Sequence, residues 1–157
     1  MHSPLRPVTP EDITHICAHM RPADRDECLA ATGLPPEVVL PLSASRWGAL
    51  TMVVPSSGEV LGLCGAHPSS GIEGFGIVWM LATTAISHNR MVFIRHARQW
   101  IELLHQHYPR LGNHVDGRNV LHIRWLQLLG FKLTGVVTLG PQSLPFVTFE
   151  RSSTDNV

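Results

Sequence analysis

Asn119-Val-Leu-His-Ile-Arg-Trp-Leu-Gln-Leu-Leu-Gly130-Phe131 is the stretch of this chain that decides the fold. Asn119 predicts a helix N-cap, because its side chain can accept hydrogen bonds from the free N–H groups of the first turn. Three apolar side chains recur at helical spacing: Ile123, Leu126 and Leu129. Gly130 suits the left-handed residue that follows a helix, and Phe131 can fold back on the last turn. We therefore expect a capped helix with one buried face.

Composition places the chain among ordinary folded domains. It has 157 residues, of which 44% are hydrophobic and 15% are charged. A chain of this length buries roughly two-thirds of the surface that it exposes when unfolded. Its 12 basic and 12 acidic residues cancel to a formal net charge of zero. Nucleic-acid binding needs a basic surface, so we expect no nucleic-acid partner.

The cysteines and the apolar runs indicate a cellular compartment. Cys17, Cys28 and Cys64 are odd in number, widely spaced and without a CxxC motif, which is typical of a reducing environment. The first residues lack the apolar core of a signal peptide. No apolar run reaches the ~18 residues that a membrane span needs. These features predict a soluble cytoplasmic protein with no membrane span.

The order of segments predicts one α+β domain over residues 1–150, followed by a flexible tail over 151–157. Segment 75–83 is apolar on both faces and predicts a central strand. Thr9 and Pro10 predict a helix start, as an N-cap and a first helical residue. The expected strands are 5–8, 49–54, 60–66, 75–83, 111–115, 132–139 and 146–150, and the expected helices are 10–20, 23–31, 35–47, 91–108 and 119–129.

This order of elements resembles that of the GNAT acyltransferases. The resemblance is carried by Leu5–Ile13, by Glu59–Gly65, and by Asn119–Phe131 with its Asn, aromatic and Gly-Phe spacing. It implies a mixed, mostly antiparallel central sheet of six or seven strands with helices on both faces. It also implies acetyl-CoA as the cofactor, and acyl transfer to an amine of a protein or a small molecule.

A narrower resemblance is to tailed-phage proteins that are similar to the small internal virion protein of T7-type phages. It is carried by Met20–Glu27, Trp79–Thr83, Asn113–Leu126 and Gly140–Phe146. It implies a bacteriophage protein in the host cytoplasm whose partners are phage or host proteins. The alternative to an enzyme is then a non-catalytic protein on a GNAT scaffold, packaged in the virion or used in its assembly.

The GNAT resemblance implies a CoA site between the strands 75–83 and 111–115. The backbone of Leu81, Ala82 and Thr83 would pair with the pantetheine arm. The pyrophosphate loop falls on 87–92, so His88, Asn89 and Arg90 would contact phosphate. Neither glycine of the family's loop is present there, and glycine is what lets a backbone approach a phosphate closely.

The candidate catalytic residues are Asn119, which the resemblance also assigns to the cofactor site, and His122, which stands at the family's small-residue position. The alternative for His122 is a packing or helix-surface histidine. Histidine can carry a proton near neutral pH. The tyrosine that many GNATs use as an acid is replaced by Leu126, beside Trp125. No general base stands out, although Asp116 and Glu73 lie near expected strand ends.

The remaining histidines predict no metal site. His15, Cys17 and His19 lie close in the sequence, but a zinc site needs three or four converging ligands, and we expect no complete set. The sequence thus leaves two hypotheses open, an acyl-CoA-dependent N-acyltransferase and a non-catalytic scaffold.

Overall fold

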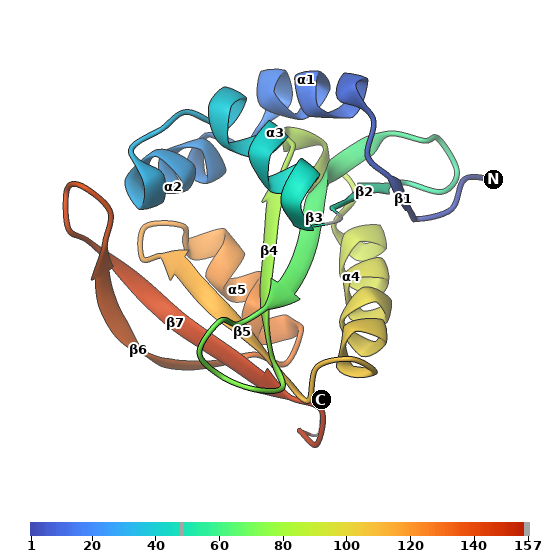
Figure 1. Cartoon of the computed structure of the whole chain (residues 1–157). Coiled ribbons are helices and arrows are strands. Elements are labelled where there is room, and N and C mark those ends of the chain that lie inside the picture. Colours follow the sequence, from blue (N-terminus) through green and yellow to red (C-terminus); the bar gives the residue numbers. More distant parts are fainter. Residues whose placement is uncertain (48, 156–157) are drawn as a thin grey trace.

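The computed structural model describes residues 1–47 and 49–155, and it has one seven-stranded sheet with helices on both faces (Figure 1). The strands lie in the order β1-β2-β3-β4-β5-β7-β6. They are β1 Leu5–Pro7, β2 Leu50–Val53, β3 Val60–Pro68, β4 Phe75–Ala82, β5 Arg110–Asp116, β6 Lys132–Leu139 and β7 Leu144–Ser152. The helices are α1 Pro10–His19, α2 Pro22–Thr32, α3 Pro36–Trp47, α4 Arg90–His105 and α5 Val120–Leu128, with a short 3₁₀ helix, η1, at Thr84–Ser87.

The sheet has the predicted topology. Every neighbouring pair of strands is antiparallel except β4 and β5, which are parallel. Parallel neighbours need a long crossover, and η1 and α4 supply it. The α+β class, the mostly antiparallel sheet and the central position of β4 are therefore confirmed.

Two apolar cores lie on opposite faces of the sheet. Side chains of α4 and α5, such as Phe93 and Leu126, pack with Val78 of β4. Side chains of α1 and α3 pack on the other face, where Trp79 of β4 meets them. Successive side chains of a strand point to opposite faces, so β4 contributes to both cores. This explains why its sequence is apolar without alternation.

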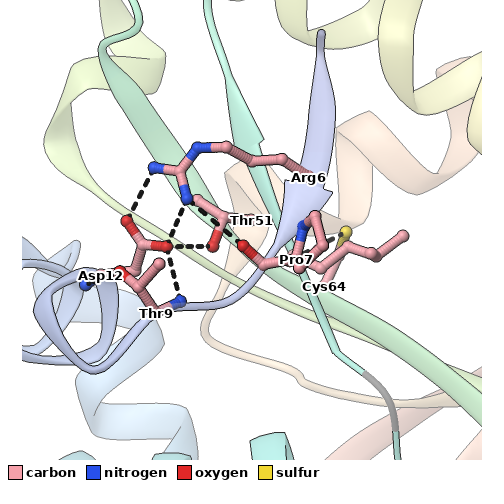
Figure 2. Close-up of polar contacts among 7 residues, drawn as sticks. Arg6, Pro7, Thr9, Asp12, Thr51 and Cys64 are labelled. Atoms are coloured by element: carbon pink, nitrogen blue, oxygen red, sulfur yellow. Dashed lines mark hydrogen bonds and ion pairs between the residues drawn. The ribbon is translucent and has the colours of Figure 1, made fainter.

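The start of α1 follows the local sequence rules. Thr9 is the N-cap, its hydroxyl accepts from the Asp12 N–H at 3.2 Å, and the Asp12 carboxylate accepts from the Thr9 N–H at 3.0 Å. The same carboxylate binds Arg6 of β1 through two hydrogen bonds and accepts from the Thr51 hydroxyl of β2 at 2.8 Å. Figure 2 shows how this one buried side chain joins a helix to two strands.

The helix α5 agrees with the prediction at its end and differs at its start. Gly130 has a left-handed φ of 88°, and the Phe131 N–H donates back to the Leu126 carbonyl at 3.0 Å. Asn119 occupies the N-cap position, but its side chain makes no hydrogen bond to the first turn. The predicted cap is therefore wrong in its chemistry, because the Asn119 amide turns inward to Asp24 of α2.

Two boundaries also differ from the predicted ones. α4 ends at His105 rather than at residue 108, because the chain turns there and the Tyr108 carbonyl lies 2.9 Å from the His105 ring. β7 runs to Ser152, and the side chain of Arg151 is buried against Glu102 of α4. The segment expected as a tail is thus partly strand, and residues 156–157 lie outside the described residues.

The hairpin of β6 and β7 reaches across to α2 (Figure 1). Its turn contains Gly140 at a φ of 76°, and a Cβ atom there would lie 1.8 Å from the carbonyl oxygen of Ala30. Only glycine permits this approach without displacing α2. The contact helps to fix α2 beside the sheet. In the described part of the chain, no helix is long and apolar enough to cross a membrane.

Candidate functional site

β4 and β5 separate halfway along their length. Their parallel pairing covers three positions and ends with Ile77 opposite Gly112. Beyond that pair, the Asn113 side chain donates from Nδ2 to the carbonyl of Val78 over 3.0 Å. β5 then follows β7, to which it stays paired as far as Asp116. The result is a V-shaped split in the sheet, with β4 on one side and β5 on the other (Figure 1).

The junction between α1 and α2 lies against the open edge of β4. Met20 forms an isolated antiparallel bridge with Thr83, and the Arg21 N–H donates to the Ala82 carbonyl at 2.9 Å. The Ala82 N–H in turn donates to Oδ2 of Asp24 at 2.7 Å. Both backbone groups that Ala82 directs into the split are therefore already bonded.

A buried polar network extends from this junction to α5. Asp24 pairs with Arg21 at 2.8 Å through Oδ1 and accepts from Nδ2 of Asn119 at 2.9 Å through the same oxygen. The side-chain oxygen Oδ1 of Asn119 accepts a hydrogen bond from the Arg21 guanidinium over 3.3 Å. The central carbon of that guanidinium lies over the Trp125 ring, 4.7 Å from the ring centre. Because the buried Asp24 charge has a cation and two N–H donors, the network satisfies its own polar groups.

Glu27 lies one helical turn after Asp24 and joins the same network. Its Oε1 accepts from the Asp116 backbone N–H at 2.8 Å and from Nδ2 of Asn119 at 3.4 Å. Burial raises the pKa of Glu27 to about 8, and the nearby Asp24 adds to the effect. At neutral pH this carboxyl group is therefore mostly protonated.

Asp116 behaves differently although it is close by. Burial opposes its ionisation, but its carboxylate accepts from the Arg118 N–H at 2.9 Å and from the Arg118 side chain at 2.7 Å. These bonds lower the pKa of Asp116 below its usual value. Asp116 is therefore an ionised carboxylate with its own cation. It is not a free base.

A cavity of about 250 Å³ passes through the split. Glu27 and Asn113 supply polar groups to its wall, whereas most of the wall is apolar. The lining comes from α2 and α3 on one face of the sheet, from α4 and α5 on the other, and from β4 and β5 between them. The cavity thus connects the two faces at the point where the sheet is open.

His122 lines this cavity from the first turn of α5. Its Nδ1 atom is buried and has no hydrogen-bond partner in the described part of the chain, and its ring centre lies 6.2 Å from that of Trp125. Burial lowers the pKa of His122, and Arg21 adds to this while Asp24 opposes it. The imidazole is therefore neutral at pH 7, with an unsatisfied nitrogen in the site.

Leu126 stands where many GNATs have a tyrosine, and a leucine cannot act as a general acid. Leu126 and its neighbour Trp125 are both buried in the core beneath the split. Tyr108 packs near Gly76, toward the paired end of β4 and away from the split. Glu73, the other carboxylate considered as a base, lies exposed in the loop before β4.

A second hollow, of about 540 Å³, lies beside the start of α4, and of the residues predicted to contact phosphate His88 is the one in its described lining. His88 and Thr83 line it. Asn89 lies just before α4 with its side-chain amide bonded to Glu59 at 3.1 Å and to the Ala85 carbonyl. Arg90 is the first residue of α4, and its side chain is exposed. The N-terminus of a helix favours an anion, so this hollow is chemically suited to phosphate.

The structure thus brings Ala82, Asn119 and His122 together around the split, whereas His88 and Thr83 line a neighbouring hollow and Asn89 and Arg90 lie outside its lining. The prediction from sequence did not include the polar residues that complete the first group, which are Arg21 at the N-cap of α2 and Asp24 and Glu27 within that helix. Their spacing of three was the available signal, because it sets all three on one face of a helix. Within the described ranges, no three His, Cys, Asp or Glu side chains converge as a metal site requires.

Comparison with known proteins was made by sequence and by structure. Neither a protein-family model nor a curated protein sequence matches this chain. Solved structures do match it over nearly their whole length. The chain is similar to the aminoglycoside acetyltransferase AAC(6')-Ib in complex with coenzyme A, with a TM-score of 0.66, 18% identity and coverage of 95% of this chain and 94% of that one.

Two further structures extend this likeness. An acetyltransferase of the GNAT family from Bacillus anthracis has a TM-score of 0.71 at 10% identity, with coverage of 96% of this chain and 95% of that one. The ribosomal-protein-alanine N-acetyltransferase from Brucella melitensis has a TM-score of 0.58 at 15% identity, with coverage of 94% and 98%. Together with the split seven-stranded sheet, these neighbours show that the chain has the fold of the GNAT acetyltransferases.

Proposed function

We propose that this protein is an acyl-CoA-dependent N-acyltransferase that acts on an amine of a protein or a small molecule. The observation that carries the proposal is the cavity of about 250 Å³ in the split between β4 and β5. Ligands of α/β sheets bind where neighbouring strands diverge, and several similar structures contain coenzyme A or acetyl-CoA.

The fit of acetyl-CoA to these residues is good in the cavity and incomplete at its edge. The apolar lining offers room for a thioester, and the hollow at His88 lies beside the N-terminus of α4, where Arg90 is an exposed cation outside the lining. Ala82 has both of its outward backbone groups bonded to the α1–α2 junction. Leu81, Ala82 and Thr83 would therefore hold the cofactor only after Arg21 and Asp24 release that edge.

Acetyl-CoA, when bound, would supply an acyl group on a thiol leaving group. The chain's own contribution is orientation and proton handling. Asn119 holds Asp24 and Glu27 in place through its amide. His122 presents a neutral imidazole with a free Nδ1 to the cavity, and such a group can accept or relay a proton at pH 7.

Calorimetry with acetyl-CoA is the direct test of the proposal. Binding should release measurable heat at protein and ligand concentrations of about 1 mM or below, since that range detects even weak complexes. Arg90→Glu should weaken the affinity by charge repulsion with phosphate. Absence of heat would reject the enzyme, whereas an affinity unchanged in Arg90→Glu would reject only the phosphate site.

The second candidate is a non-catalytic GNAT scaffold with an internal virion or assembly role, and the occupied edge at Ala82 favours it. A scaffold needs no free strand edge and no glycine loop. Mass spectrometry of purified particles of the encoding phage should then detect the protein. Its absence from them, together with acetyl-CoA binding, would leave the enzyme. The cytoplasmic location and the phage or host partners are predictions that belong with this candidate.

A further inference from the structure

We infer that Glu27 is the catalytic residue that takes the proton from the acceptor amine, and that this amine enters the cavity from the face covered by α2 and α3. The inference rests on the proposed function, because it assigns a base to the proposed transfer. Neither the family's motif nor the sequence pattern assigned Glu27 a role.

Glu27 is positioned so that one of its oxygens is held by the chain and the other is open to the cavity. Glu27 lines the cavity from α2, beside the split where the sheet is open. Its Oε1 is fixed by the Asp116 N–H and the Asn119 amide, so the carboxyl plane is held by β5 and α5 together. Among the described residues, no hydrogen bond to Oε2 is found, and this atom is not enclosed. One oxygen is thus anchored while the other remains available to a ligand.

Glu27 also differs from its neighbours in charge pairing. Three acidic side chains meet in this region, and two of them have a cation. Asp24 pairs with Arg21 at 2.8 Å, and Asp116 pairs with Arg118 at 2.7 Å. Glu27 has no ion pair with any described residue of the chain. A substrate amine would therefore meet the one carboxyl group of these three that has no ion pair with a described residue.

Burial and two neighbouring carboxylates act on the proton of Glu27. Burial disfavours its negative charge most, and Asp24 of α2 and Asp116 of β5 repel that charge, which raises its pKa to about 8. Cys28, His114 and His122 line the same cavity, and Arg21 and Arg118 are bound to Asp24 and Asp116. A general base works best when its pKa lies near the operating pH, and a pKa near 8 meets that condition in mildly basic solution.

The transfer step balances in protons and bonds. The amine nitrogen attacks the thioester carbonyl carbon, a C–N bond forms, and the C–S bond breaks. The ionised Glu27 carboxylate takes one proton from the attacking nitrogen. The departing sulfur takes a proton from solvent, and Glu27 returns its proton to solvent before the next cycle.

The lining on the α2–α3 side describes the acceptor. Apart from Glu27, its side chains are uncharged: Cys28, Ala31, Thr32, Val39 and Ser43. A polycation would leave its further charges unpaired against this wall, and an unpaired charge is costly to bury. The acceptor class that fits is a single primary amine on an apolar stem.

The test measures the rate of acetyl transfer by the full chain from acetyl-CoA to n-hexylamine as a function of pH. Release of the free thiol of CoA reports the rate. Wild type should show kcat/KM rising through a pKa near 8, and spermidine should be a poorer acceptor than n-hexylamine. Glu27→Gln should lower kcat about 100-fold, and its kcat/KM should no longer rise through a pKa near 8. Gln keeps an oxygen for the Asp116 N–H, so the variant should fold.

Two further variants keep the result interpretable. Asp26→Asn removes the same charge from an exposed position on the same helix and should retain the wild-type rate and profile. Glu27→Asp retains a carboxylate and should keep the rise of kcat/KM through a pKa near 8, at a reduced rate. Thermal unfolding of all three should establish that they are folded at the assay temperature.

The outcomes separate the inference from the proposed function. Thiol release that is unchanged in Glu27→Gln overturns the role of Glu27 and leaves the enzyme intact. A wild type that gives no heat with acetyl-CoA and releases no thiol with either amine overturns the proposed function. In that case, carbon-13 NMR of the Glu27 carboxyl group still tests the amine site. n-Hexylamine should lower its pKa, and a pKa that does not move overturns the inference as well.

Discussion

Two carboxyl groups of this chain, the buried Asp12 and the half-buried Glu27, show how different surroundings give one functional group opposite properties. Asp12 is bound by Arg6, Thr51 and the Thr9 N–H (Figure 2). Burial opposes its charge, but these donors lower its pKa to about 2. Glu27 lacks a cation, and burial raises its pKa to about 8.

The difference distinguishes a structural group from a reactive one. All the donors around Asp12 belong to the chain, so its charge is used in joining α1 to β1 and β2. Glu27 has one oxygen anchored and faces a cavity, so a ligand can still change its protonation. Perturbed carboxyl groups that line cavities are candidates for function, whereas fully paired ones are usually structural.

The largest expected change in the free energy of unfolding comes from the network that includes Glu27, and not from the surroundings of Asp12. Asp24→Asn removes the charge that holds Arg21 and disturbs the bond to the Asn119 amide. We expect a loss of roughly 3–5 kcal/mol in the free energy of unfolding, because one member of a buried ion pair is left alone. Urea unfolding of both proteins measures it. A loss under about 1 kcal/mol would mean that the network contributes little to the fold.

The second effect is a pH dependence with opposite signs at the two sites. The pKa of Glu27 rises from 4.5 to about 8 on folding, so its contribution is full below pH 4.5 and is lost as the pH rises toward 8. After allowance for water in the cavity, we expect wild type to lose roughly 2–3 kcal/mol relative to Glu27→Gln over that window. Parallel curves for the two proteins would contradict the raised pKa.

Asp12 should show the reverse dependence at a lower pH. Its pKa falls from 3.8 to about 2 on folding, so its contribution is present above pH 3.8 and is lost as the pH falls through 2. Asp12→Asn should cost about 2 kcal/mol at pH 7, since Arg6 is partly exposed and water can replace part of the bond. Chemical unfolding at pH 7 and pH 2.5 tests both statements, and the difference between the two proteins should shrink at the lower pH.

The smallest effect compares two residues at helix starts. Thr9→Ala removes a cap that is formed and should cost about 1 kcal/mol in the free energy of unfolding. Asn119 makes no cap, so Asn119→Ser, which could form one, should not stabilise the protein. A gain in stability for Asn119→Ser would mean that its contacts with Asp24 and Arg21 contribute less than a normal cap.

These two helix starts also show how far local sequence reasoning extends. The predicted cap at Thr9 is correct because its partner, Asp12, lies three residues away on the same helix. The predicted cap at Asn119 is wrong because its partner, Asp24, is 95 residues distant in the sequence. Capping preferences describe how side chains bond to backbone N–H groups nearby in the sequence. At Asn119, the hydrogen bond to the buried Asp24 carboxylate of another helix replaces that local bond.

In the candidate site, too, some features were predicted from the sequence and others depended on distant partners. The GNAT resemblance implied a cofactor site between β4 and β5, and it directed attention to Ala82 and His122. Nothing in the pattern predicted that Asp24 would bind the Ala82 N–H, since 58 residues separate them. Glu27 was unremarkable among the charges of its helix until α2 was seen beside the cavity.

The amino-acid sequence by itself determined the elements, their order and the class of the fold, because hydrophobic periodicity, caps and turn residues act over a few positions. The tertiary structure alone decided which polar groups are paired and which face the cavity. That decision depends on burial and on partners from distant segments, and these set the proton affinity of a carboxyl group. Asp12 and Glu27 are the same kind of acid in the sequence, and only the folded chain makes one a structural anion and the other a candidate base.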